Sequence, residues 1–156
     1  MKKRSILTSA LIVVFLCLVV WPLTLLAQGQ SRNEWESQVR RQLRAVALLL
    51  NLGDLTSTYN PYIGTLRDNT YTDVSYTLHA GVSYALIGVC DNDCPDLDLK
   101  LYDENGNLID KDTAPDSTPV IRVTPRWTGA FYVRVIMSEC EDNPCWYGVG
   151  EFEPAR

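Results

Sequence analysis

The sequence predicts an all-β protein: an antiparallel, jelly-roll-like β-sandwich preceded by one amphipathic helix and an N-terminal signal or anchor segment. Three observations predict the sandwich. From Asp96 to Tyr102, leucines alternate with polar residues, as in a strand with one buried face. The Asn105-Gly106 pair that follows tolerates the positive φ angles of a tight hairpin. Roughly seven or eight short strand-like runs, separated by turn signals, fill most of the chain.

Three segments divide the chain, and we expect a single hydrophobic core. Residues 1–27 are predicted as a signal peptide or membrane anchor, residues 28–53 as the amphipathic helix, and residues 54–156 as the β-sandwich domain. The length of the last segment suits one domain, since domains commonly contain roughly 100 to 150 residues.

The amino terminus has the features of a secretory signal. Residues 2–4 are all basic, and residues 6–20 are almost wholly apolar. Ala27 would stand at the cleavage position. The apolar run continues to Leu26 and is nearly long enough to span a bilayer, so a retained membrane anchor is the alternative. In both cases we expect the rest of the chain to be secreted or periplasmic.

The part of the chain that would be exported is acidic. Three of the 14 basic residues and none of the 19 acidic residues lie in residues 1–27, which leaves a formal charge of −8 for the remainder. An acidic module repels phosphate backbones, which argues against nucleic acid as a partner. We expect an extracellular or envelope protein or polysaccharide, and a membrane contact only if the N-terminal segment is retained.

Residues 28–53 predict a helix that packs on the sandwich. Asn33 can cap its start, Glu36 stands where a capping box places an acid, and Gly53 can end the helix in a left-handed conformation. One apolar stripe recurs at helical spacing, formed by Trp35, Val39, Leu43, Val46 and Leu50. Off this stripe lie three arginines, Arg40, Arg41 and Arg44. They form either a solvated basic face or a contact for anionic lipid headgroups or a partner.

The rest of the chain alternates short apolar strands with turns. Residues 54–69 leave room for one short edge strand. Further strands are predicted over residues 70–79, 82–90, 96–102, 120–123 and 130–137, with the apolar pattern resuming at 108–109 and a last strand following Cys145. Residues 112–119 form a loop by composition.

Three stretches resemble a known family. GVSYALIGV, DLDLKLYDENGNLI and VIRVTPRWTGAFYVRVIM, which lie within about Thr70 to Phe152, are similar to the bacterial pre-peptidase C-terminal domain, here as a stand-alone copy without a peptidase. The resemblance implies a jelly-roll-like sandwich of a secreted protein with no catalytic residues of its own. The two cysteine loops are additions to the usual pattern of that family.

Four cysteines lie outside the targeting segment, in CDNDC (Cys90 and Cys94) and CEDNPC (Cys140 and Cys145), whereas Cys17 lies inside it. An even set in an exported chain favours disulfides over zinc, which usually requires closer cysteines or histidine ligands. We predict local bridges within each loop. A pairing between the two loops remains an alternative, because four cysteines allow three connectivities.

Strand parity places the acidic loops together. If consecutive strands run antiparallel, the loops that follow Cys90, Asp112 and Glu139 lie at one end of the sandwich, and the Asn105-Gly106 and Thr128-Gly129 turns lie at the other. Carboxylates in turns suit calcium, which binds about six to eight oxygen ligands. The candidate ligands are Asp91, Asp93, Asp96, Asp112, Asp116, Glu139 and Asp142, with Glu141 beside them. The alternative is a solvated acidic rim that keeps the protein soluble.

No catalytic motif is present in the sequence. The single histidine, His79, is expected at the surface. Aromatic side chains offer a better candidate site, because Tyr102, Trp127, Tyr132 and Trp146 could form a platform for a sugar or peptide, although strand aromatics also build cores.

We therefore expect a non-enzymatic exported module that binds a protein, polysaccharide or envelope component through its acidic loops. An accessory or inhibitory partner of a secreted peptidase is the alternative.

Overall fold

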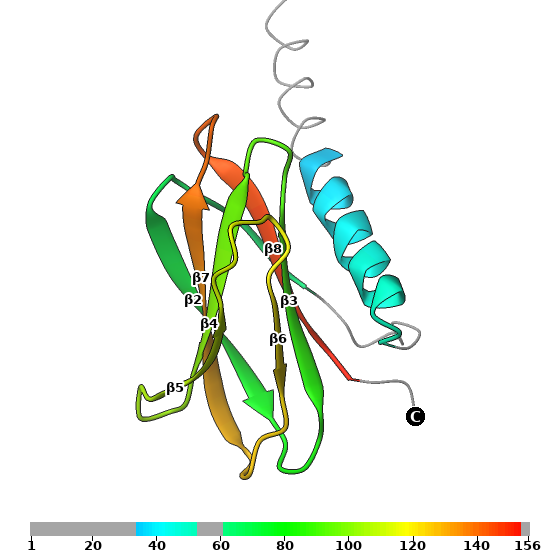
Figure 1. Cartoon of the computed structure of the whole chain (residues 1–156), viewed down its shortest axis with the longest axis vertical. Coiled ribbons are helices and arrows are strands. Elements are labelled where there is room, and N and C mark those ends of the chain that lie inside the picture. The colour runs from blue at the N-terminus through cyan, green and yellow to red at the C-terminus, as the bar shows by residue number, and fades with distance from the viewer. Residues whose placement is uncertain (1–33, 53–60, 154–156) are drawn as a thin grey trace, which may run out of the picture. The chain divides into compact units, whose positions relative to one another are not determined.

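The computed structural model describes residues 34–52 and 61–153, which form a helix and eight strands (Figure 1). The strands are β1 (Tyr62–Leu66), β2 (Thr70–Leu78), β3 (Tyr84–Cys90), β4 (Asp96–Tyr102), β5 (Leu108–Asp112), β6 (Val120–Val123), β7 (Gly129–Glu139) and β8 (Cys145–Phe152). The predictions for residues 1–27, Asn33 and Gly53 lie outside the described residues. Among the described residues, no helix is apolar and long enough to cross a membrane.

The predicted antiparallel β-sandwich is confirmed. Its two four-stranded sheets have the orders β1-β8-β3-β6 and β2-β7-β4-β5, and every strand pair is antiparallel. Consecutive strands pass from one sheet to the other except at the β4-β5 hairpin, which gives a jelly roll. β1 is the short edge strand expected within residues 54–69.

Leucines fill the space between the sheets. Leu97, Leu99 and Leu101 of β4 are fully buried, as their alternation predicts, and so are Val133 and Val135 of β7. The remaining members of this cluster include Leu78, Leu86, Ile121, Phe131 and Tyr147. The sandwich core therefore follows the period of two that the sequence shows.

β3 is buried along its whole length. Leu86 and Cys90 belong to the core between the sheets, whereas Ala85, Ile87 and Val89 belong to a second core cluster on the opposite face of the strand. A strand with two buried faces requires apolar residues at consecutive positions rather than alternation, which explains the continuous apolar run of this segment.

The helix of residues 34–49 supplies the other side of that second cluster. From Glu36 onward it belongs to the same compact unit as the sandwich, and Val39, Leu43 and Ala47 pack with the outer residues of β3 and with Phe152. Arg41 and Arg44 are exposed, and Arg40 forms an ion pair of 2.9 Å with Glu36. The helix ends at Leu49, and Asn51, just beyond it, has a left-handed φ of 53°.

The β4-β5 hairpin differs in detail from the tight turn that was expected. Only Gly106 has a positive φ, and the buried carboxylate of Asp103 organises a longer loop by accepting hydrogen bonds from the backbone nitrogens of Asn105 and Asn107. Leu108 and Ile109, where the sequence resumes an apolar pattern, are exposed because β5 is an edge strand. The hydrophobic pattern alone did not distinguish this edge from a buried strand.

Candidate binding surfaces

Four loops meet at one end of the sandwich, which we call the acidic pole: residues 67–69, 91–95, 113–119 and 140–144 (Figure 1). The backbone nitrogen of Glu141 donates to the carbonyl of Asp93 at 2.8 Å, which joins the two cysteine loops. The nitrogen of Leu97 donates to the carbonyl of Asp116 at 2.9 Å, which joins the third loop to β4. The arrangement expected from strand parity is therefore present.

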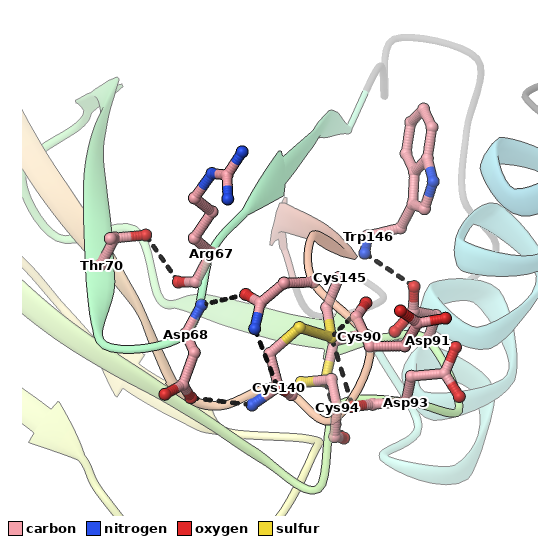
Figure 2. Close-up of a disulfide and its surroundings, with 12 residues drawn as sticks. Arg67, Asp68, Thr70, Cys90, Asp91, Asp93, Cys94, Cys140, Cys145 and Trp146 are labelled. Carbon is pink, nitrogen blue, oxygen red and sulfur yellow. Dashed lines mark hydrogen bonds between the residues drawn. A yellow bond between two sulfur atoms is a disulfide. The ribbon is translucent and has the colours of Figure 1, made fainter.

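Both disulfides lie at this pole, and both are local (Figure 2). Cys90 pairs with Cys94, and Cys140 pairs with Cys145, as predicted. All four cysteines are buried. Because each bridge closes a loop of only a few residues, its main effect is to shape that loop rather than to restrict the unfolded chain.

Asp68 fastens the loop between β1 and β2 to the second cysteine loop (Figure 2). Its carboxylate accepts a hydrogen bond of 3.0 Å from the backbone nitrogen of Cys140, and its own backbone nitrogen donates to the side chain of Asn143 at 2.6 Å. Sequence analysis did not single out Asp68, because nothing in the sequence identifies the distant backbone that it binds.

Asp91 fastens the first cysteine loop to β8 (Figure 2). Its Oδ2 accepts a hydrogen bond of 2.7 Å from the backbone nitrogen of Trp146, and its own nitrogen donates to the carbonyl of Trp146 at 3.0 Å. The residue is only 4% exposed. Burial raises the pKa of this carboxyl, and the charge of Asp93 adds to that effect, while the hydrogen bond from Trp146 opposes it.

The remaining predicted calcium ligands differ in their surroundings. Desolvation raises the pKa of Asp96, and the neighbouring charges of Asp98, Glu139 and Asp116 raise it further. The Oδ1 atom of Asp96 is buried and has no hydrogen-bond partner among the described residues. Asp112 instead accepts hydrogen bonds from the nitrogens of Ala114 and Val120.

Among residues 34–52 and 61–153, no group of three or more histidine, cysteine or acidic residues is arranged to hold a metal ion. Glu139, Glu141 and Asp142 are exposed, and Asp93 is half-buried. The exposed carboxylates give the pole a negative surface, whereas Asp91 and Asp112 mainly hold the loops together.

The four aromatic residues of the predicted platform occupy three separate places. Tyr102 and Tyr132 lie directly opposite each other on β4 and β7. Trp127 stacks on Phe131 with ring centroids 5.4 Å apart, in the turn that precedes β7. Trp146 packs against the cluster beneath the helix. Only the two tyrosines therefore share a face.

That face, the outer surface of the β2-β7-β4-β5 sheet, carries further residues that sequence analysis missed. Arg134 on β7 binds both carboxylate oxygens of Asp73 at 2.8 Å. Its guanidinium lies 4.1 Å from the ring centroid of Tyr71 and 5.3 Å from that of Tyr102. We call the set Tyr71, Lys100, Tyr102, Lys111, Tyr132 and Arg134 the tyrosine–lysine face. Tyr71 could have been found from the strand pattern. It is an odd number of residues from Val74, Tyr76 and Leu78, which face inward, so it faces outward.

Comparisons with known proteins find similar solved structures. No protein-family model matches the chain, and a search of curated proteins finds no match. Similar solved structures include the pre-peptidase C-terminal domain of a collagenase from Bacillus anthracis, at 10% identity and a TM-score of 0.47, covering 59% of this chain and 87% of that one. That domain belongs to the family that the sequence resembles, but no family model confirms membership.

Two further solved structures are similar to a comparable degree. One is PliG from Aeromonas hydrophila, a periplasmic inhibitor of g-type lysozyme, at 6% identity and a TM-score of 0.46, covering 65% of this chain and 90% of that one. The other is a glycosylation-associated protein complex, Gap123, from Streptococcus agalactiae, at 12% identity and a TM-score of 0.40, covering 65% and 43%. Similarities at this level concern the arrangement of strands alone.

Proposed function

We propose that this chain is an exported, non-enzymatic binding module that recognises a protein through its acidic pole. The observation that carries the proposal is the exposure of Glu141 and Asp142, on a loop that a disulfide and backbone hydrogen bonds hold in place, and of Glu139 at the adjoining end of β7. The disulfides also support export, because such bonds persist in oxidising compartments.

A pole built in this way suits recognition of a basic surface. The loops need little further ordering on binding, which reduces the entropic cost of association. Exposed carboxylates steer a positively charged partner toward the pole and reject an acidic one. Catalysis has no comparable support. The carboxylates of Asp91, Asp98 and Asp112 accept hydrogen bonds from other parts of the fold. The single histidine, His79, is exposed and lies outside these loops.

Copurification with matched variants tests the proposal. The double variant Glu141→Gln with Asp142→Asn should retain about one fifth or less of the partner that the unmodified chain retains from the native extracellular fraction, because exposed charges contribute to steering and affinity. The control variant, Glu104→Gln with Asp110→Asn, removes two exposed carboxylates outside the pole and should retain the partner fully. Equal retention by the two double variants would contradict the proposed site. A peptidase as the retained partner would select the accessory or inhibitory role.

Calcium stays a prediction for the same pole. The reason is Asp96. Its buried Oδ1 has no hydrogen-bond partner among the described residues, and the charges that act on it are those of other carboxylates. A cation bound there would offset this repulsion and stabilise the folded state by mass action. We expect the melting temperature to be several degrees higher in excess calcium than in chelator. Superimposable melting curves would remove calcium from the proposal.

A further inference from the structure

A row of positively charged residues crosses the outer surface of the β2-β7-β4-β5 sheet. Lys100 on β4 lies directly opposite Arg134 on β7 and directly opposite Lys111 on β5, so the three side chains share one face in adjacent positions. Like charges placed directly opposite each other destabilise a sheet. The pairing of Lys100 with Lys111 therefore imposes a cost on folding.

Of these three cations, only Arg134 has an ion-pair partner among the described residues. Asp73 binds the guanidinium of Arg134 through both oxygens, which satisfies that charge. No ion pair to Lys100 or Lys111 is present in the part of the chain that the structure describes. Lys111 is exposed and Lys100 is half-buried. Within a chain whose overall charge is negative, this leaves two neighbouring ammonium groups available for an anionic ligand.

Tyrosine rings flank this row on both sides. Tyr102 and Tyr132 form the next cross-strand pair, about 7 Å along the strands, since residues two apart are separated by that rise. Tyr71, on the other side, lies under the guanidinium of Arg134. Tyr71 is 58% exposed and Tyr132 is 40% exposed, so both rings are accessible to a ligand on this face. The guanidinium of Arg134 lies within cation–π distance of the rings of Tyr71 and Tyr102.

We propose that the tyrosine–lysine face binds a glycan that carries carboxylate groups, such as a chain of uronic acids. The apolar C–H face of a sugar ring stacks on a tyrosine, and the hydroxyl of that tyrosine can hydrogen-bond to the sugar. The carboxylate of the same or the next sugar reaches the ammonium groups of Lys100 and Lys111. A neutral glycan leaves both lysines unpaired, and a peptide of acidic residues offers carboxylates but no sugar C–H face to stack on a tyrosine.

This binding site is separate from the acidic pole. The face is a sheet surface that carries Lys100 and Lys111, whereas the pole consists of loops with exposed carboxylates. The two proposals therefore fail independently, and each is tested with variants that leave the other surface unchanged.

Titration calorimetry with oligogalacturonate as the probe tests the inference on the full chain. The variant Lys100→Gln with Lys111→Gln should bind at least about tenfold more weakly, since two exposed ion pairs together contribute about that factor. Tyr132→Ala should weaken binding about fivefold through loss of ring contact. The control variant, Arg122→Gln with Arg126→Gln, removes two exposed cations elsewhere and should bind like the unmodified chain.

A second measurement excludes misfolding as the cause. The lysine variant removes like charges that face each other. Its melting temperature should therefore be no lower than that of the unmodified chain, and up to about 2 °C higher. Weaker binding at unchanged or higher stability supports the inference. Equal affinity of the lysine variant and the control, equal binding of polyglutamate and oligogalacturonate, or no binding of oligogalacturonate by the unmodified chain would overturn it.

Discussion

Valine in place of Gly148 is expected to lower the free energy of unfolding by about 3 kcal/mol, because overpacking a well-filled site costs about this much. Gly148 lies on β8 and faces Val39 and Leu43 of the helix. A β-carbon at this position would collide with a methyl group of Val39 and would stand 3.2 Å from a methyl group of Leu43. Both helix residues are almost fully buried, so neither can move its side chain into solvent without loss of packing. Chemical denaturation followed by circular dichroism measures the change.

A double-mutant cycle separates this collision from other effects of the substitution. Val39→Ala alone removes two buried methyl groups and should cost about 2 kcal/mol. In the double variant the new valine occupies the space that Val39 leaves, so the combined loss should be smaller than the sum by about 1 kcal/mol or more. Strict additivity, or an unchanged stability of Gly148→Val, would show that the helix does not pack on β8 as the structure has it.

The strands could be predicted because their signal is local. The alternation of leucines from Asp96 to Tyr102 reports one buried face, and the structure buries all three leucines completely. Strand parity then placed both disulfide loops at one pole without any knowledge of the register. Edge strands were harder, because Leu108 and Ile109 look like core residues in the sequence and yet are exposed on β5.

The binding surfaces could be predicted only in part, because they depend on register and on contacts between distant segments. Tyr102 and Tyr132 were singled out as aromatic residues, but their pairing follows from the alignment of β4 with β7. The same holds for Lys100 and Lys111, whose repulsive pairing appears only when β4 is aligned with β5. Gly148 likewise had no local signal, since its role is set by the helix, which precedes it by about 100 residues in the sequence.

Asp91 anchors the first cysteine loop, and its replacement by alanine is expected to lower the free energy of unfolding by about 2 kcal/mol. The loss arises because the backbone nitrogen of Trp146 would remain without its acceptor in a partly buried site. Asp91→Asn keeps an acceptor oxygen and should lose much less. The control is Asp93→Ala in the same loop, which should have little effect, because the loop contact with Glu141 uses the backbone carbonyl of Asp93.

The pH dependence distinguishes the charge of Asp91 from its hydrogen bond. Burial raises the pKa of the folded carboxyl above the value of about 3.9 in the unfolded chain, so at neutral pH the folded state carries the charge at a cost. As the pH falls through the raised pKa, the folded protein takes up the proton before the unfolded chain does, and the cost is relieved. We therefore compare the free energy of unfolding of Asp91→Asn with that of the unmodified chain. The difference, variant minus unmodified, should be highest at neutral pH and should fall as the pH approaches 4. A constant difference between the two proteins from pH 7 to about pH 4, measured by denaturant unfolding, would contradict a raised pKa at this site.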